Sequence, residues 1–164
     1  QPWSLRLAHV IGRNALPLAP YILLDQGAQE GVREGMPVVA GGGILVGTVI
    51  QVERHQSTLL PLTHPNSRIA ATVENQQRTI GVVQGSANLA VELLLVARSE
   101  TLTQGQLVIT SGLQDRIPRG LVIGQIGTIN NDPNQVFLEA AVDGFLSVER
   151  YTELGVVVAD LPQR

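Results

Sequence analysis

Short apolar runs separated by turn residues make up most of the hydrophobic pattern of this chain. They are rich in Val, Ile, Leu and Thr, and they cover residues 21–25, 36–40, 44–52, 57–62, 68–74, 79–84, 89–97, 106–110, 121–129, 136–143 and 156–159. Residues 5–10 alternate instead, with Leu5, Leu7 and His9 on one face. Because a sustained helical period is missing, this spacing predicts an all-β protein.

An internal similarity indicates two related β-units. Residues 32–49 read as a polar turn, a glycine, a strand, a glycine-containing tip and a second strand, and residues 102–126 repeat this order. Gly47 and Gly124 lie inside the two second strands, where a missing Cβ permits a bend or bulge. We expect Val122 to be buried in the second unit. A strand is also expected at 156–159, and periodicity does not decide which of the two units it joins.

The triple glycine Gly41-Gly42-Gly43 raises the question of a phosphate-binding loop. A dinucleotide fingerprint requires G-x-G-x-x-G before a helix, but the residue three after Gly43 is Val46 and a strand pattern follows. We therefore predict a hairpin tip in which the glycines supply positive φ angles.

Composition removes several classes of function. All eleven basic residues are arginine, and the absence of lysine excludes a P-loop and a Schiff-base nucleophile. The absence of cysteine excludes thiol nucleophiles and disulfides. The net charge is −3 and the arginines are scattered, so we expect no nucleic-acid binding. No run of 18 apolar residues occurs in this sequence.

Candidate catalytic and metal-binding residues do not form a known motif. His9, His55 and His64 lack the spacing of a zinc site, so we expect no metal and no cofactor. Ser111 is the obvious candidate nucleophile of a two-unit β-protein, but the Gly-Asp-Ser-Gly context of chymotrypsin-like proteases is absent. Paired carboxylates for glycoside cleavage are not excluded by spacing alone, although most acids lie in turns. We expect a protein that is not an enzyme.

Two segments are candidates for protein contact. The first follows a strand and combines apolar, aromatic and arginine side chains, namely Phe145, Leu146, Arg150 and Tyr151. An alternative interpretation is that Phe145 and Leu146 plug the end of the second unit. The second segment is the apolar hairpin tip at Gly43 and Ile44. The alternative interpretation is an ordinary exposed tip that contacts no partner.

An ordered set of motifs resembles a known family. It comprises residues 10–13, 24–39, 45–47, 62–67, 108–113 and 117–124. Together these segments resemble the extracytoplasmic β-domain of MreC, the bacterial rod-shape-determining proteins, from about residue 9 to about residue 159. Two positions depart from the family pattern. His64 stands where an acidic residue usually precedes Pro-Asn-Ser, and Asp115-Arg116 replaces a more glycine-rich link.

The resemblance implies two small six-stranded β-barrel domains in tandem, which we assign to residues 1–74 and 75–164. It also implies a non-enzymatic scaffold of the cell-wall elongation complex. Such a scaffold maintains rod shape by self-association and by binding the class B penicillin-binding transpeptidase, MreD and, indirectly, MreB and RodA. The implied location is the periplasm, with a single-pass membrane anchor in the sequence upstream of Gln1.

An alternative function is a glycan- or protein-binding β-module of the cell envelope without a role in shape. The chain has one Trp, two Tyr and two Phe, few for the flat aromatic platforms of carbohydrate modules. A hydrolase that uses Ser111 is a more distant alternative.

Overall fold

The computed structural model describes residues 3–14, 21–86, 90–145 and 150–159. Within them lie one short 3₁₀-helix, η1 (Ala28–Glu30), and the strands β1 (Trp3–Asn14), β2 (Tyr21–Leu24), β3 (Pro37–Ala40), β4 (Ile44–Val52), β5 (Ser57–Pro61), β6 (Arg68–Val73), β7 (Ile80–Gly85), β8 (Val91–Ala97), β9 (Leu107–Thr110), β10 (Val122–Asn130), β11 (Phe137–Asp143) and β12 (Glu153–Ala159). The predicted all-β class is confirmed.

Six strands close a first ring through antiparallel pairing. β1 pairs with β2 and β12, β12 with β3, β3 with β4, β4 with β5, and β5 again with β2. Alternation along each strand directs every second side chain inward. The apolar cluster of this ring includes Ile22, Leu24, Val38, Val49, Leu59, Leu154 and Val156.

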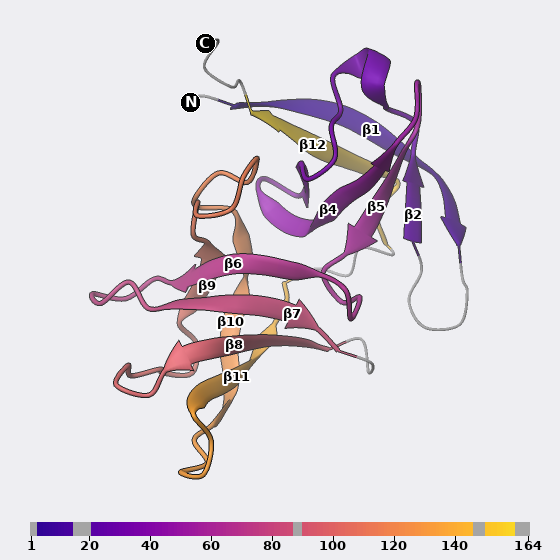
Figure 1. Cartoon of the computed structure of the whole chain (residues 1–164). Helices are drawn as coiled ribbons and strands as arrows, with labels where there is room; N and C mark the ends of the chain where they lie inside the picture. The colour runs from indigo at the N-terminus through magenta and orange to yellow at the C-terminus, as the bar shows by residue number, and fades with distance from the viewer. Residues whose placement is uncertain (1–2, 15–20, 87–89, 146–149, 160–164) are drawn as a thin grey trace.

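The other six strands close a second ring in the same way. β6 pairs with β7 and β9, β7 with β8, β8 with β11, β11 with β10, and β10 with β9. Its cluster includes Ile69, Val83, Leu93, Val96, Val108, Ile123, Ile126 and Leu138. Figure 1 shows this ring below the strands of the first.

The two rings are not simply consecutive along the chain. All strands of the second ring lie between β5 and β12 in sequence, so the second ring is inserted in the first. Our division at residue 74 had placed β6 in the first unit, but β6 pairs only with strands of the second. The apolar pattern of β6 could not reveal this, because strand pairing depends on residues distant in sequence.

Glycines permit close backbone approach at two matching positions. The β3–β4 register shifts between the partners of Gly47 and Leu45, and the β9–β10 register shifts between Val122 and Gly124. A Cβ at Gly47 would collide with the carbonyl oxygen of Leu60, and one at Gly124 with that of Asp143. Both predicted bulge sites are confirmed.

The β3–β4 hairpin also joins the two rings. Gly41, Gly42 and Gly43 have φ angles of 49°, 87° and 119°, as predicted for a hairpin tip. Beyond this tip, Ile44 pairs with Val122 in parallel fashion, and the amide of Val122 donates to the carbonyl of Gly43 at 3.0 Å.

Side chains of the first ring complete this junction. Val39, Leu45 and Val157 belong to strands of the first ring but pack in the hydrophobic cluster of the second. The junction therefore combines one backbone bridge with continuous apolar packing.

The expected burial of Val122 is wrong. Val122 is half-buried, whereas its neighbours Leu121 and Ile123 are each only 3% exposed and lie in the core. The bulge at Val122–Gly124 interrupts the simple alternation on which the expectation rested.

Ile123→Asp is expected to unfold the second ring, because it buries an unpaired carboxylate in the apolar cluster. The expected loss of unfolding free energy is on the order of several kcal/mol. Val122→Asp is the control, with a smaller loss, since its side chain reaches solvent. Thermal and urea unfolding followed by circular dichroism measure both variants, and equal losses would contradict this assignment of the core.

Candidate partner-binding surfaces

The described residues after β11 include one exposed aromatic side chain and one that packs on the first ring. Phe145 is 46% exposed and is not part of the second cluster, so it does not plug that ring. Tyr151 is half-buried and packs against the cluster of the first ring, and its carbonyl accepts a hydrogen bond from the Arg13 guanidinium at 3.0 Å. Arg150 is exposed, and Leu146 lies outside the described residues. Their role in partner contact stays a prediction.

The hairpin tip at Gly43 and Ile44 is partly engaged within the chain. The carbonyl of Gly43 and the backbone of Ile44 meet Val122, and the Ile44 side chain is half-buried. Gly41 and Gly42 remain exposed. Gly41 and Gly42 are therefore more open to solvent than Gly43 and Ile44.

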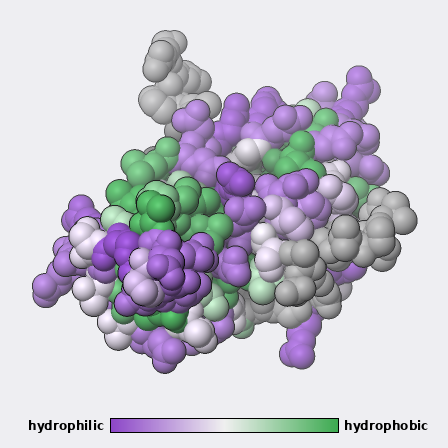
Figure 2. Space-filling model, turned by 60° about the horizontal axis from the view of Figure 1, so that its bottom comes forward, coloured by the Kyte–Doolittle hydropathy of each residue, from purple (hydrophilic) through white to green (hydrophobic). Residues whose placement is uncertain are grey.

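An exposed apolar face of the second ring escaped the sequence analysis. Figure 2 brings the bottom of the Figure 1 view forward and shows apolar side chains gathered at the left of the molecule. Large apolar side chains exposed on β7, β8 and β11 are Ile80, Leu95 and Phe137. The run Leu93-Leu94-Leu95 was the available signal, because three consecutive strand residues cannot all face inward.

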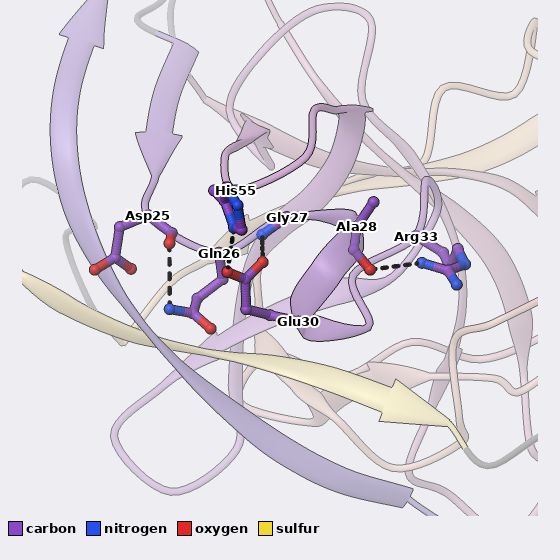
Figure 3. A network of polar contacts seen from close by, with 7 residues as sticks. All are labelled: Asp25, Gln26, Gly27, Ala28, Glu30, Arg33 and His55. Atoms are coloured by element: carbon purple, nitrogen blue, oxygen red, sulfur yellow. Dashed lines mark hydrogen bonds and ion pairs between the residues drawn. The ribbon is translucent and has the colours of Figure 1, made fainter.

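A polar network fixes one end of the first ring (Figure 3). The segment that contains η1 lies on the turn between β4 and β5, where the amide of Ala28 donates to the carbonyl of Glu53 at 2.8 Å. A Cβ at Gly27 would collide with the backbone of Glu53 and Gln56, so the two backbones touch. Glycine is required for this contact.

Glu30 holds the same two segments together. Its Oε2 accepts the amide of Gly27 at 2.9 Å, and its Oε1 lies 2.9 Å from Nδ1 of His55. The hydrogen bond from His55, followed by that from Gly27, lowers the pKa of the Glu30 carboxyl below its ordinary value. The contacts of Glu30 and His55 are structural ones between two loops.

His9 links three elements of the first ring. Its Nδ1 lies 3.3 Å from Oδ2 of Asp25, which follows β2, and its Nε2 lies 3.2 Å from Oε1 of Glu153 on β12. The amide of His9 also donates to Oδ1 of Asp25 at 2.7 Å. These side chains are exposed or half-buried, so the pairing contributes modestly to stability.

The other sequence candidates serve local structure. Nδ1 of His64 accepts the amide of Asn66 at 3.0 Å, and its ring lies 5.2 Å from that of Tyr21. Oγ of Ser111 accepts the amide of Leu113 at 3.2 Å and so closes a turn. Across the described part of the chain, no group of three His, Asp or Glu side chains is arranged to hold a metal ion.

Two closed rings with a shared apolar junction, the second inserted before the last strand of the first, define a double-ring β-domain. Among the described candidates, Phe145 and Arg150 are exposed, whereas Ile44 and Tyr151 are half-buried. A family model described as the barrel core of the rod shape-determining protein MreC matches residues 10–158. The chain therefore belongs to the MreC family.

Individual relatives agree with this assignment. The cell shape-determining protein MreC of Listeria monocytogenes is 30% identical over 76% of this chain and 43% of its own length. The MreC of Caulobacter vibrioides is 33% identical over 75% of this chain and 35% of its own length. The chain thus spans less than half the length of these curated relatives.

Solved structures share the fold. MreC from Pseudomonas aeruginosa superposes with a TM-score of 0.79 at 26% identity, over 93% of this chain and 98% of that one. A complex between PBP2 and MreC from Helicobacter pylori gives a TM-score of 0.81 at 13% identity, over 97% and 99%. In the residues that the structure describes here, no helix has both the length and the apolar character to traverse a bilayer.

Glu30→Gln is expected to lower the melting temperature at neutral pH, because a neutral amide accepts weaker hydrogen bonds from His55 and Gly27. The folded-state pKa of Glu30 is lowered. Its stabilisation is therefore complete above the ordinary glutamate pKa of about 4.3 and is lost as pH falls through the lower folded value. Melting curves of both proteins should converge below that value.

Glu34→Gln is the matched control for this experiment, since Glu34 is an exposed carboxylate of the same loop region. Its melting temperature should stay close to that of the wild type at every pH. A difference between Glu30→Gln and wild type that persists unchanged in acid would show that charge is not what Glu30 contributes.

Proposed function

We propose that this chain is the extracytoplasmic double-ring domain of a non-enzymatic scaffold in the bacterial cell-wall elongation complex. The observation that carries the proposal is the family match over residues 10–158. The fold supports it physically, because closed rings filled by apolar side chains offer outer faces, rather than an interior cavity, for recognition. Such a domain acts by holding partner proteins in place.

The first partner in this proposal is the class B penicillin-binding transpeptidase. A solved complex of PBP2 with MreC from Helicobacter pylori contains a protein of this fold, and that relation supports the choice. We extend the proposal to MreD, to indirect contact with MreB and RodA, and to self-association; membership of the MreC family supports this extension. A solved relative described as the major periplasmic domain of the cell shape-determining filament MreC supports a periplasmic location. The membrane anchor belongs to the full-length protein in this proposal.

Within this proposal Phe145 is the strongest single anchor among the sequence candidates. It is large, aromatic and 46% exposed, two residues after the end of β11, and interface anchors are commonly aromatic. Leu146, Arg150, Tyr151, Gly43 and Ile44 complete the proposed contact residues.

The test is direct binding of this chain to the purified ectodomain of the class B transpeptidase from the same organism, measured by surface plasmon resonance. Phe145→Ser is expected to raise Kd about fivefold or more, since truncating an interface anchor costs over about 1 kcal/mol. Leu113→Ser is the matched control, because Leu113 is 70% exposed but lies on the β9–β10 loop. It should leave Kd unchanged.

The glycan-binding alternative gives a different result in the same set of measurements. Retention of this chain by purified cell-wall sacculi, together with failure to bind the transpeptidase, would replace the scaffold by a glycan module. Ester or peptide turnover that disappears in Ser111→Ala would instead favour the hydrolase.

A further inference from the structure

The outer side of β7, β8 and β11 combines an apolar strip with two glutamates beside it. Five apolar side chains lie on this outer side: Ile80, Val82, Leu94, Leu95 and Phe137. Val82 and Leu94 are cross-strand partners, as are Phe137 and Ala97. Ile80, Leu95 and Phe137 are 56%, 54% and 41% exposed. We call these residues, with Glu92 and Glu139, the β7–β8–β11 face.

A bulge directs two consecutive leucines outward. The β8–β11 register shifts so that Leu93 pairs with Ala140 and Val96 with Leu138. Leu94 and Leu95 therefore both lie opposite the single residue Glu139. Leu95 has a φ of 61°, in the left-handed region that leucine rarely adopts. The strand thus adopts a disfavoured conformation that exposes an apolar side chain.

Two carboxylates border the strip, Glu139 opposite Leu94 and Leu95 on β11, and Glu92 two residues before Leu94 on β8. Glu92 is the cross-strand partner of Ala141, and Ala141 lies two residues after Glu139 on β11. Both glutamates line one shallow depression together with Thr128 and Asn130. Among the described residues, neither carboxylate has a hydrogen bond or an ion pair. Two neighbouring carboxylates repel each other, and a cation bound next to them relieves this repulsion.

The arginine that follows β8 is not available to neutralise these carboxylates. Arg98 donates to the carbonyls of Asp132 and Gln135 at 3.0 and 3.2 Å and to Oδ1 of Asn131 at 2.8 Å. Its guanidinium therefore holds the β10–β11 loop. Arg98 is therefore engaged away from Glu92 and Glu139.

We propose that the β7–β8–β11 face binds an amphipathic segment of a partner protein whose apolar side covers Leu94, Leu95 and Phe137. A lysine or arginine of that segment pairs with Glu92 and Glu139. The apolar strip selects an apolar surface, and the uncompensated acidic pair selects the sign of the adjacent charge. Ring closure gives β7, β8 and β11 neighbours on both sides, so the segment docks by side chains. This inference does not rest on the identity of the transpeptidase.

The first experiment uses a synthetic probe of this chemistry. A 14-residue helical peptide with leucines on one side and lysines on the other is titrated into the ¹⁵N-labelled chain, followed by amide chemical shifts. Shifts are expected at Ile80, Leu94, Leu95 and Phe137. A peptide with glutamate in place of every lysine should bind at least tenfold more weakly.

Variants separate the charge from the apolar strip. Glu92→Gln combined with Glu139→Gln should weaken the lysine peptide about tenfold at low salt, as expected for two surface ion pairs. Glu34→Gln combined with Glu53→Gln removes the same net charge from exposed loops of the first ring and should change Kd less than twofold. Leu95→Asn removes the apolar side chain while tolerating the left-handed backbone, and should weaken both peptides.

Three results would overturn the proposal. The first is a set of shifts that maps outside this face. The second is equal binding by the Glu92/Glu139 and Glu34/Glu53 double variants, which would reduce the effect to net charge. The third is a dimer of the free chain, seen by sedimentation, that Leu95→Asn dissociates, because the face would then be covered by a second copy. Circular dichroism verifies folding, and the glutamine variants decide alone if Leu95→Asn does not fold.

Discussion

Closure of the backbone hydrogen-bond network is the constraint on which the rest of this structure depends. An open sheet leaves a row of unpaired amides and carbonyls at each edge. A small sheet that does not close also cannot enclose an apolar interior. Here β12 fills the gap between β1 and β3, and its Leu154 and Val156 complete the first core. Closure and core formation are thus the same event in this ring.

Glycine makes that closure sterically possible. At Gly47 and Gly124 a strand bends against a neighbouring carbonyl, and the matching positions in the two rings explain the internal similarity of the sequence. The junction is equally compact, because the β3–β4 hairpin is part of the first ring and reaches the core of the second through Leu45. This packing leaves large apolar side chains such as Ile80 and Leu95 exposed on the outer side of the second ring.

Local chemistry could be read from the sequence, whereas pairing between distant segments could not. Alternation identified the strands, and the lack of a Cβ identified the tip and both bulges. The assignment of β6 to the second ring depends on β9, which lies over thirty residues away, and no periodicity contains that information. The burial of Val122 was mispredicted and the outward-facing Leu95 was not anticipated for one shared reason, since a bulge changes the inward–outward phase by one residue. Among the binding candidates, Phe145 is exposed as a contact requires, while Tyr151 packs against the first core.

The insertion of one ring within the other has a consequence for biosynthesis. A ribosome delivers β6 to β11 before β12, so a nascent chain can finish its second ring while the first still lacks its closing strand. During that interval the backbone amides and carbonyls of β1 and β3 that later pair with β12 have no partner. They are able to pair with a strand from another molecule. The risk of such intermolecular pairing ends only when the seven residues of β12 have been synthesised and paired with β1 and β3.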